Sequence, residues 1–235
     1  RPTCFGLIVA TRNIFNGALA EDARKQLLAK MDQLGYDYVI PPATATRNGA
    51  IETVKDAIIC AELFRKESAR IDGIVVVLPN FGDELGVVET ILRARLDVPV
   101  LVQASDDEND KVSLAQRRDS FCGKLSVCNN LFQNGISFTD TATHTCAVDS
   151  AAFAEDLRRF AAVCRTVRGL KGARVGQIGT RPGAFRTVRY SEKLLQATGI
   201  VVEPIDLSEI LERARKVPAG DGDLAAKIAA IRAYG

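Results

Sequence analysis

The sequence predicts an α/β protein, in which a Rossmann-like domain with an open parallel sheet is followed by the start of a second Rossmann-like domain. Two observations carry this prediction. Segments with the pattern of strands alternate with segments of helical spacing, as in right-handed crossover connections. The strand pattern at Gly73–Leu78 is also wholly apolar, which is typical of a parallel sheet covered by helices on both faces. The chain has 235 residues and is 47% hydrophobic, which is enough for two modest domains.

The first predicted domain covers residues 1–147. Gly35 follows its first helix, at the position where a glycine commonly ends one. Apolar residues at helical spacing predict which side of each later helix faces the sheet. We expect strands at 5–10, 38–40, 73–78 and 98–102, helices at 18–34, 51–69 and 85–95, and a further helix beginning at 121–124. The predicted inward sets are Ile51, Val54, Ile58, Ala61 and Phe64, then Leu85, Val88 and Leu92, then Leu125, Cys128 and Leu131.

A long amphipathic helix at 149–167 is expected to join the two domains, with Asp149 or Ser150 as its N-cap. We assign residues 148–169 to this bridging helix and residues 170–235 to the beginning of a second α/β domain, which we expect to continue in the natural protein. The apolar stripe of the bridge is Phe153, Leu157, Phe160, Val163 and Val167. The second domain is expected to hold strands at 174–178 and 201–205 and helices at 190–197, 208–217 and 223–234, the last with Leu224, Ile228 and Ile231 on one face.

The overall charge argues against several classes of partner. Lys and Arg number 31 against 29 Asp and Glu, so the formal net charge is +2, and no strong field favours nucleic acid. No apolar stretch is long enough to span a bilayer, and no signal-peptide pattern opens the chain. The six cysteines form no CxxC pair, which is typical of reduced, buried thiols. We therefore expect a cytoplasmic protein that binds neither nucleic acid nor membranes.

A loop that follows the apolar strand is the first candidate binding site. Ligands of open parallel sheets bind beyond the carboxyl ends of the strands, and Asn80–Glu84 lies there. Its amide, carboxylates and aromatic ring suit a polyhydroxylated ligand, so a sugar is the first hypothesis. The amides of Asn129, Asn130 and Gln133, which lie on a predicted helix, can also donate and accept hydrogen bonds to hydroxyl groups.

Other polar features have plainer interpretations. The acidic run Ser105–Asp110 has the composition of a solvated loop rather than of a cation site, because no ligand spacing stands out. The segment Gly179–Arg186 could cradle a phosphate, but a structural turn or the rim of a sugar site is favoured because no GxGxxG or P-loop motif is present. His144 is interpreted as a loop histidine, and a Cys–His nucleophile with Cys122 or Cys128 is disfavoured because both thiols are expected to be buried. The sequence thus shows no self-sufficient catalytic constellation.

Three segments, spread over nearly the whole chain, carry a family resemblance. The first is the loop Asn80–Glu84, the second is the helix entrance Cys122–Leu131, and the third runs from Gly179–Phe185 to Pro204–Ile210. In their order and spacing they resemble the amino-terminal half of the L-fucose/L-arabinose isomerase family.

This resemblance implies a metal-dependent isomerase that interconverts an aldose and a ketose, an intramolecular oxidoreduction, on a deoxy or unmodified monosaccharide. It implies Mn²⁺ as cofactor, with metal ligands and proton-transfer groups mostly in the carboxyl-terminal portion, so no metal ligand or catalytic residue is assigned to this segment. It also implies a homo-oligomer, a trimer or hexamer, whose sites are shared between subunits. The implied substrate-binding residues are Arg12, Asn80, Phe81, Asp83, Glu84, Asn129, Asn130 and Gln133.

Each of these assignments has a structural alternative. Arg12 could pair with a surface carboxylate, Phe81 could only fill the loop, and the amides could cap helix ends. Some arabinose isomerases carry a histidine within 129–133, and this sequence has none, which argues against strict L-arabinose specificity. A second class of function also stays open: a non-catalytic α/β protein that binds or senses sugars.

Overall fold

The computed structural model describes residues 1–113 and 115–234, and the chain divides into two compact units, Arg1–Arg168 and Gly169–Gly235. The first unit is a parallel sheet of five strands that alternate with helices, which confirms the predicted Rossmann-like α/β class. None of the described helices has the length and apolar character needed to cross a membrane.

The sheet of the first unit has the strand order β2-β1-β3-β4-β5, and every neighbouring pair is parallel. β1 and β3 are central and buried along their whole length, because helices cover both of their faces. The short β5 was not predicted, because its two polar residues, Thr139 and Asp140, form neither an apolar run nor an alternation of apolar and polar residues. The strands are β1 (Cys4–Val9), β2 (Asp37–Val39), β3 (Gly73–Leu78), β4 (Val100–Ala104) and β5 (Thr139–Asp140).

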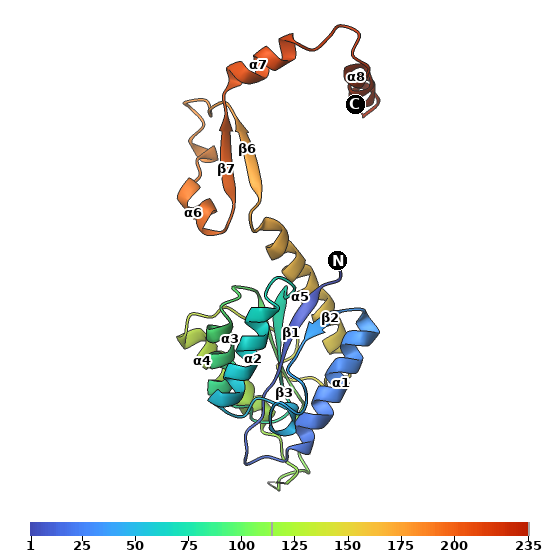
Figure 1. Ribbon diagram of the computed structural model, residues 1–235, viewed down its shortest axis with the longest axis vertical. Helices are drawn as coiled ribbons and strands as arrows, with labels where there is room; N and C mark the ends of the chain where they lie inside the picture. Colours follow the sequence, from blue (N-terminus) through green and yellow to red (C-terminus); the bar gives the residue numbers. More distant parts are fainter. Residues whose placement is uncertain (114, 235) are drawn as a thin grey trace. The chain divides into compact units, whose positions relative to one another are not determined.

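Helices cover the sheet in two layers (Figure 1). α1 and α5 pack on one face, where they enclose a core that includes Phe5, Leu27 and Phe160. α2, α3 and α4 pack on the other face around Phe64, Val76 and other apolar side chains. The helices are α1 (Ala18–Leu34), α2 (Val54–Lys66), α3 (Glu84–Ala94), α4 (Ser120–Gln133) and α5 (Ala151–Leu170), and a short 3₁₀ turn, η1 (Arg47–Gly49), precedes α2.

Local sequence signals explain several helix ends. α1 closes at Gly35, whose φ of 69° is the left-handed conformation that a glycine adopts without a Cβ clash. α2 begins later than predicted, at Val54, because Thr53 and Asp56 form a capping box there. Ser150 is the N-cap of α5: its Oγ accepts a hydrogen bond from Phe153 N at 3.1 Å.

The predicted inward faces of three helices are wrong in part. Leu85 and Leu92 of α3 are 50% and 42% exposed, Leu125 of α4 is 54% exposed, and Ile58 of α2 is 36% exposed. The sheet-facing positions of these helices hold small side chains beside the larger Phe64 and Leu131, and the small side chains let the helices pack closely. Each helix carries two apolar stripes, and periodicity alone cannot choose between them. The buried residues include Ala57, Cys60 and Ala61 in α2, Gly86, Val87 and Val88 in α3, and Gly123 and Val127 in α4.

α5 packs its apolar stripe into the core of the first unit. Phe153, Leu157 and Phe160 are buried as predicted, whereas Val163 is 37% exposed and Cys164 takes the inward position in its place. The boundary between the two units falls within the last turn of this helix.

The second unit is built on a two-stranded parallel sheet of β6 (Arg174–Ile178) and β7 (Val201–Ile205). Both strands match the predicted ranges. Gly199, with φ of 87°, follows the helix between them as expected. Leu224, Ile228 and Ile231 are exposed. The remaining elements are the 3₁₀ turn η2 (Arg186–Val188) and the helices α6 (Glu192–Ala197), α7 (Leu207–Arg215) and α8 (Gly222–Tyr234).

Candidate functional site

The strand order of the first unit fixes where the loops at the carboxyl edge of the sheet diverge, and we call the place between the loops after β1 and β3 the crevice. From β1 the chain passes through α1 on one face, and from β3 it passes through α3 on the other face. The loops that leave these two adjacent strands therefore diverge, and open α/β sheets bind ligands at such a switch point. Thr11 and Arg12 follow β1 here, and Asn80–Glu84 follow β3. The sequence-predicted loop thus lies at the switch point.

Arg12 and Phe81 meet across this crevice. Cζ of Arg12 lies 4.4 Å from the centroid of the Phe81 ring, so the guanidinium covers one ring face in a cation–π contact. Nη2 of Arg12 is 3.5 Å from the carbonyl oxygen of Gly82, a long hydrogen bond. Its Nε is buried and has no hydrogen-bond partner among the described residues. The pair therefore places an aromatic surface beside a guanidinium group, which makes only one long hydrogen bond to the protein among the described residues.

Asn80 ties the two loops together beneath that pair. Its side chain is fully buried, and Nδ2 donates to Oγ1 of Thr11 at 2.7 Å, while Oδ1 lies 3.0 Å from the same hydroxyl. The side chain thus holds the end of β3 against the end of β1. Its contacts are to protein rather than to the crevice.

The two carboxylates of the loop are engaged at the start of α3. Oδ1 of Asp83 accepts a hydrogen bond from Gly86 N at 2.7 Å, so Asp83 is the N-cap of the helix. The carboxylate of Glu84 accepts a hydrogen bond from the hydroxyl of Ser126 in α4. Both contacts fix the direction in which the loop leaves β3.

Two residues that sequence reasoning did not assign hold the Phe81 backbone in place. The carbonyl of Arg118 accepts from Phe81 N at 2.7 Å, and Nη1 of Arg118 donates to Pro79 O at 2.9 Å. Gly123 lies against the same loop: a Cβ there would come within 2.8 Å of Phe81 Cα. Gly123 belongs to the motif Cys122–Leu131 of the family resemblance, so the sequence could have indicated its importance. Arg118 lies in a polar connector between β4 and α4, where no sequence motif marks it.

The three helix amides do not join this crevice. Asn129, Asn130 and Gln133 lie in the last part of α4, whereas Gly123, near its first turn, contacts Phe81. At 1.5 Å per residue, the ten-residue step from Gly123 to Gln133 is about 15 Å along the helix. Oδ1 of Asn130 accepts from Asn134 Nδ2 at 2.9 Å. These amides form a separate surface of the first unit.

The acidic run Ser105–Asp110 has structural contacts. Both oxygens of Asp107 cap α4, with Ser120 N at 2.9 Å and Phe121 N at 3.0 Å. Glu108 pairs with Lys111 at 2.5 Å, and the hydrogen bond from Lys111 lowers the pKa of the Glu108 carboxyl. A cavity of about 270 Å³ lies beside this run, lined partly by Asp22, Asp106, Glu108, Arg118 and Asp149.

His144 lies against the start of α4. Its ring centroid is 4.2 Å from that of Phe121, and its Nε2 is 3.0 Å from the Phe121 carbonyl. Cys122 is exposed, so the expectation of a buried thiol is wrong for this residue. Cys128 is partly buried, and burial raises the pKa of its thiol to about 11, so it is protonated at neutral pH. Among the hydrogen bonds of the described residues, none joins either thiol to His144, as a Cys–His nucleophile would need.

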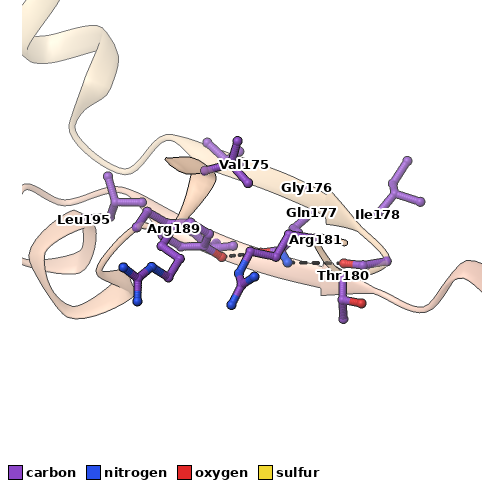
Figure 2. A pocket seen from close by; sticks show the side chains of 12 residues that line it. Val175, Gly176, Gln177, Ile178, Thr180, Arg181, Arg189 and Leu195 are labelled. Atoms are coloured by element: carbon purple, nitrogen blue, oxygen red, sulfur yellow. Dashed lines mark hydrogen bonds between the residues drawn. The ribbon is translucent and has the colours of Figure 1, made fainter. Parts of the chain in front are cut away.

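A second cavity, of about 640 Å³, lies in the second unit beside the carboxyl end of β6 (Figure 2). Its lining includes Gln177, Gly179, Arg181 and Arg189, and no described lining residue is a carboxylate. Gln177 accepts a hydrogen bond from the Tyr190 hydroxyl and donates to Gly179 O at 3.2 Å. The guanidinium groups of Arg181 and Arg189 extend in the same direction in Figure 2.

The loop that follows β6 has the form of a structural turn. Nη1 of Arg181 donates to carbonyls of its own loop, Pro182 O at 3.4 Å and Gly183 O at 3.3 Å. The 3₁₀ turn η2 separates this loop from α6, which has six residues. The loop therefore does not lead directly into a long helix, as a phosphate cradle does.

Comparison with known proteins identifies the family. A model of the N-terminal domain of fucose/sulfoquinovose isomerase matches residues 6–171, which include Arg12, the loop 80–84 and all of α4. A search of curated proteins gives no match. The matched range covers most of the chain and confirms the resemblance found in the sequence. The chain belongs to the family defined by the N-terminal domain of fucose/sulfoquinovose isomerase, a family of sugar isomerases.

Proposed function

We propose that this chain supplies a sugar-binding surface of a metal-dependent aldose–ketose isomerase, and that Arg12 and Phe81 contact the monosaccharide. The observation that carries the proposal is the Arg12–Phe81 pair at the switch point of a sugar isomerase domain. Open sheets bind ligands at this place, independently of the family.

The chemistry of the pair suits a monosaccharide. A sugar presents C–H groups on one side of its ring or chain and hydroxyl groups along its edges. The exposed part of the Phe81 ring offers an apolar surface to the C–H groups, and the guanidinium N–H groups of Arg12 donate to hydroxyl oxygens. The ring also holds the guanidinium in place, which reduces the rotamer entropy lost on binding.

The other predicted residues have different parts in this proposal. Asn80, Asp83 and Glu84 shape the loop through their contacts with Thr11, Gly86 and Ser126. Such supporting contacts keep a binding pair within the narrow geometry that recognition needs. Asn129, Asn130 and Gln133 would meet a sugar only in another subunit, because they lie away from the crevice along α4.

The proposed cofactor is Mn²⁺, but no described residue is assigned to it. Residues 1–113 and 115–234 contain no group of three or more His, Cys, Asp and Glu side chains placed to hold a metal ion. The donor set of this chain therefore does not fit a metal centre by itself, and we assign it no step of proton transfer. Its proposed part is to bind and orient the sugar.

Isothermal titration tests the proposal on the wild-type chain and on Phe81→Ala. The panel contains L-fucose, D-arabinose, L-arabinose and sulfoquinovose, each with and without Mn²⁺. We expect at least one sugar to bind, and Phe81→Ala to weaken it about tenfold or more. Tyr234→Ala, which removes a 97% exposed aromatic ring at the end of α8, serves as the control and should bind as wild type does.

Conversion of the same sugars from aldose to ketose by the full-length protein, which the resemblance implies carries the metal ligands, is followed by NMR with and without Mn²⁺ and reports the isomerase activity itself. Metal-dependent conversion of one sugar supports the isomerase. Sugar binding without conversion in any mixture favours the sugar-binding or sensing alternative. Absence of binding to every sugar contradicts the proposed site.

A further inference from the structure

The cavity in the second unit carries positive charge that the surrounding protein does not balance. From Arg174 to Ser191 the sequence contains four arginines and neither Asp nor Glu. Arg174, at the start of β6, pairs with Glu203 of β7 at 2.5 Å. Arg181 and Arg189 line the cavity of about 640 Å³, where no described lining residue is a carboxylate. Two uncompensated cations at one cavity indicate that its ligand is an anion.

The guanidinium groups of Arg181 and Arg189 are positioned by carbonyl oxygens of their own loop. Nη1 of Arg181 donates to Pro182 O at 3.4 Å and to Gly183 O at 3.3 Å. Nε of Arg189 donates to Arg186 O at 3.2 Å. These hydrogen bonds use one nitrogen of each group, and Figure 2 shows the two groups extending in the same direction. Their other N–H groups are therefore available to one shared acceptor, and an anion that both groups contact offsets the repulsion between them.

The floor of the cavity is apolar and leaves room for more than an inorganic ion. Val175 and Val202 are register partners on β6 and β7, so their side chains lie on the same face of the two-stranded sheet. Val188 and Leu195 add further apolar surface to the lining. A volume of about 640 Å³ lies within the range of sites that enclose a small organic molecule. The cavity thus has space for an organic group beside the anion.

Gln177 and Tyr190 fix the wall of the cavity next to the arginines. Gln177 lies two residues after Val175 on β6, so its side chain shares the cavity face of the sheet. Its Oε1 accepts a hydrogen bond from the Tyr190 hydroxyl, and its Nε2 donates to Gly179 O at 3.2 Å. This contact holds the Tyr190 ring beside Arg189 as a flat surface for a ligand.

We propose that the cavity of the second unit binds a phosphate monoester of a small organic molecule. Arg181 and Arg189 contact the phosphate group, and the floor of Val175 and Val202 lies under the organic part. A phosphate monoester carries about −1.5 to −2 charges at neutral pH, which matches two guanidinium groups better than a carboxylate does. Arginine also forms paired hydrogen bonds with phosphate oxygens.

This site differs from a phosphate cradle at a helix N-terminus. Side chains bind the anion here, because η2 separates the loop from the six-residue α6. The site lies wholly within the second unit. The proposal is therefore independent of the crevice at the ends of β1 and β3 and of the sugar bound there.

Isothermal titration of the whole chain with glucose 6-phosphate, AMP and inorganic phosphate tests the site. We expect at least one of the two esters to bind, and to bind at least about fivefold more tightly than inorganic phosphate, because the apolar floor contacts only an ester. Arg181→Gln and Arg189→Gln should each raise the dissociation constant of that ester about tenfold or more, since each removes charge-assisted hydrogen bonds.

Arg186→Gln is the matched control. Arg186 carries the same charge in the same loop but is not among the described lining residues, and the substitution keeps the carbonyl that Arg189 contacts. It should change the dissociation constant by less than about twofold. All three arginines are exposed, so the three variants should keep the wild-type circular dichroism and Tm.

Backbone amide shifts of the ¹⁵N-labelled whole chain locate the bound ester. Shifts at Gln177, Gly179 and Arg189 support the proposal, and the ester that binds more tightly shows whether the organic part is a sugar or a nucleoside. Shifts confined to Arg12 and Phe81 would place the ester in the crevice and overturn the proposal. So would the failure of both esters to bind, equal weakening by all three arginine substitutions, or inorganic phosphate that binds as tightly as the esters.

Discussion

Gly123, near the start of α4, lies directly against the backbone of Phe81, and a Cβ at position 123 would come within 2.8 Å of Phe81 Cα and 3.3 Å of Asn80 O. The close approach brings α4 up to the loop that follows β3. The position of the Phe81 ring therefore depends on the absence of a side chain at position 123 of α4.

Gly123→Ala should destabilise the protein and move the loop. The atoms that its Cβ would meet belong to backbone, which cannot turn aside as a flexible side chain can. We expect a loss of about 1–3 kcal/mol in the free energy of unfolding, measured by urea denaturation, together with weaker sugar binding. Gly169→Ala is the control, since nothing lies within 4 Å of its added Cβ, and it should stabilise α5 slightly. Equal stability of Gly123→Ala and wild type would contradict the contact.

The buried pair of Thr11 and Asn80 should show a large energetic coupling. Thr11→Val leaves the Asn80 amide without its partner, and Asn80→Ala leaves the Thr11 hydroxyl unpaired. Each single variant should lose about 1–3 kcal/mol of stability. The double variant should lose clearly less than the sum, as a double-mutant cycle of urea midpoints would measure. Additive losses would mean that the two side chains act independently.

Lys124 should be important for stability although it carries a buried charge. Its Nζ donates to Thr141 Oγ1 at 2.7 Å and to His144 O at 2.8 Å, and it forms an ion pair with Asp140. Lys124→Met keeps most of the volume but removes all three contacts, so we expect a loss of about 1–3 kcal/mol and faster hydrogen exchange in residues 140–146. Lys25→Met, at a position whose side chain is 75% exposed, should change the stability by less than about 0.5 kcal/mol. Similar effects of the two substitutions would argue against this role.

The stability of the fold should fall at alkaline pH because of its buried thiols. Burial raises the pKa of Cys164 from 9.0 to about 12 and that of Cys128 to about 11. The unfolded chain releases these protons at lower pH than the folded chain does. The contribution of the protonated thiols to the free energy of unfolding is therefore complete below pH 9, and it is lost progressively as the pH rises from 9 toward 12.

A series of thermal unfolding curves checks this dependence. The Tm should stay level below pH 9 and decrease above it, and Cys164→Ala should show a shallower decrease because one raised pKa is gone. A steeper decrease in Cys164→Ala than in wild type would contradict the assignment.

The sequence predicted the elements of the first unit better than their orientation. The wholly apolar run at Gly73–Leu78 and the helix at Ala18–Leu34 match the structure residue for residue, because continuous burial and Gly35 leave clear local signals. The orientation of α3 failed because Leu85 and Leu92 form an apolar stripe at the same helical period as the buried one. Periodicity alone cannot tell an apolar stripe on the exposed side of a helix from a stripe that packs in the core.

The sequence predicted where in the fold the candidate site lies, but it did not predict which side chains contact each other there. The loop after β3 and Arg12 after β1 follow from the rule for strand ends and from the family resemblance. The cation–π contact between Arg12 and Phe81 depends on which strands are neighbours in the sheet. The hydrogen bonds by which Arg118 holds the Phe81 loop depend on the path of the connector between β4 and α4. Neither leaves a local pattern. The separation of Asn129, Asn130 and Gln133 from the crevice follows from the direction in which α4 runs after Gly123.

Chemical-shift mapping of a bound monosaccharide locates the sugar site on the first unit. The ¹⁵N-labelled protein is titrated with the sugar that binds most tightly in the panel, and the backbone amide signals are followed residue by residue. We expect the largest shifts at Arg12, Phe81 and Gly82, and we expect them to be lost in Phe81→Ala. Shifts confined to the cavity around Arg181 and Arg189, or to residues 129–133, would contradict a sugar site at the ends of β1 and β3.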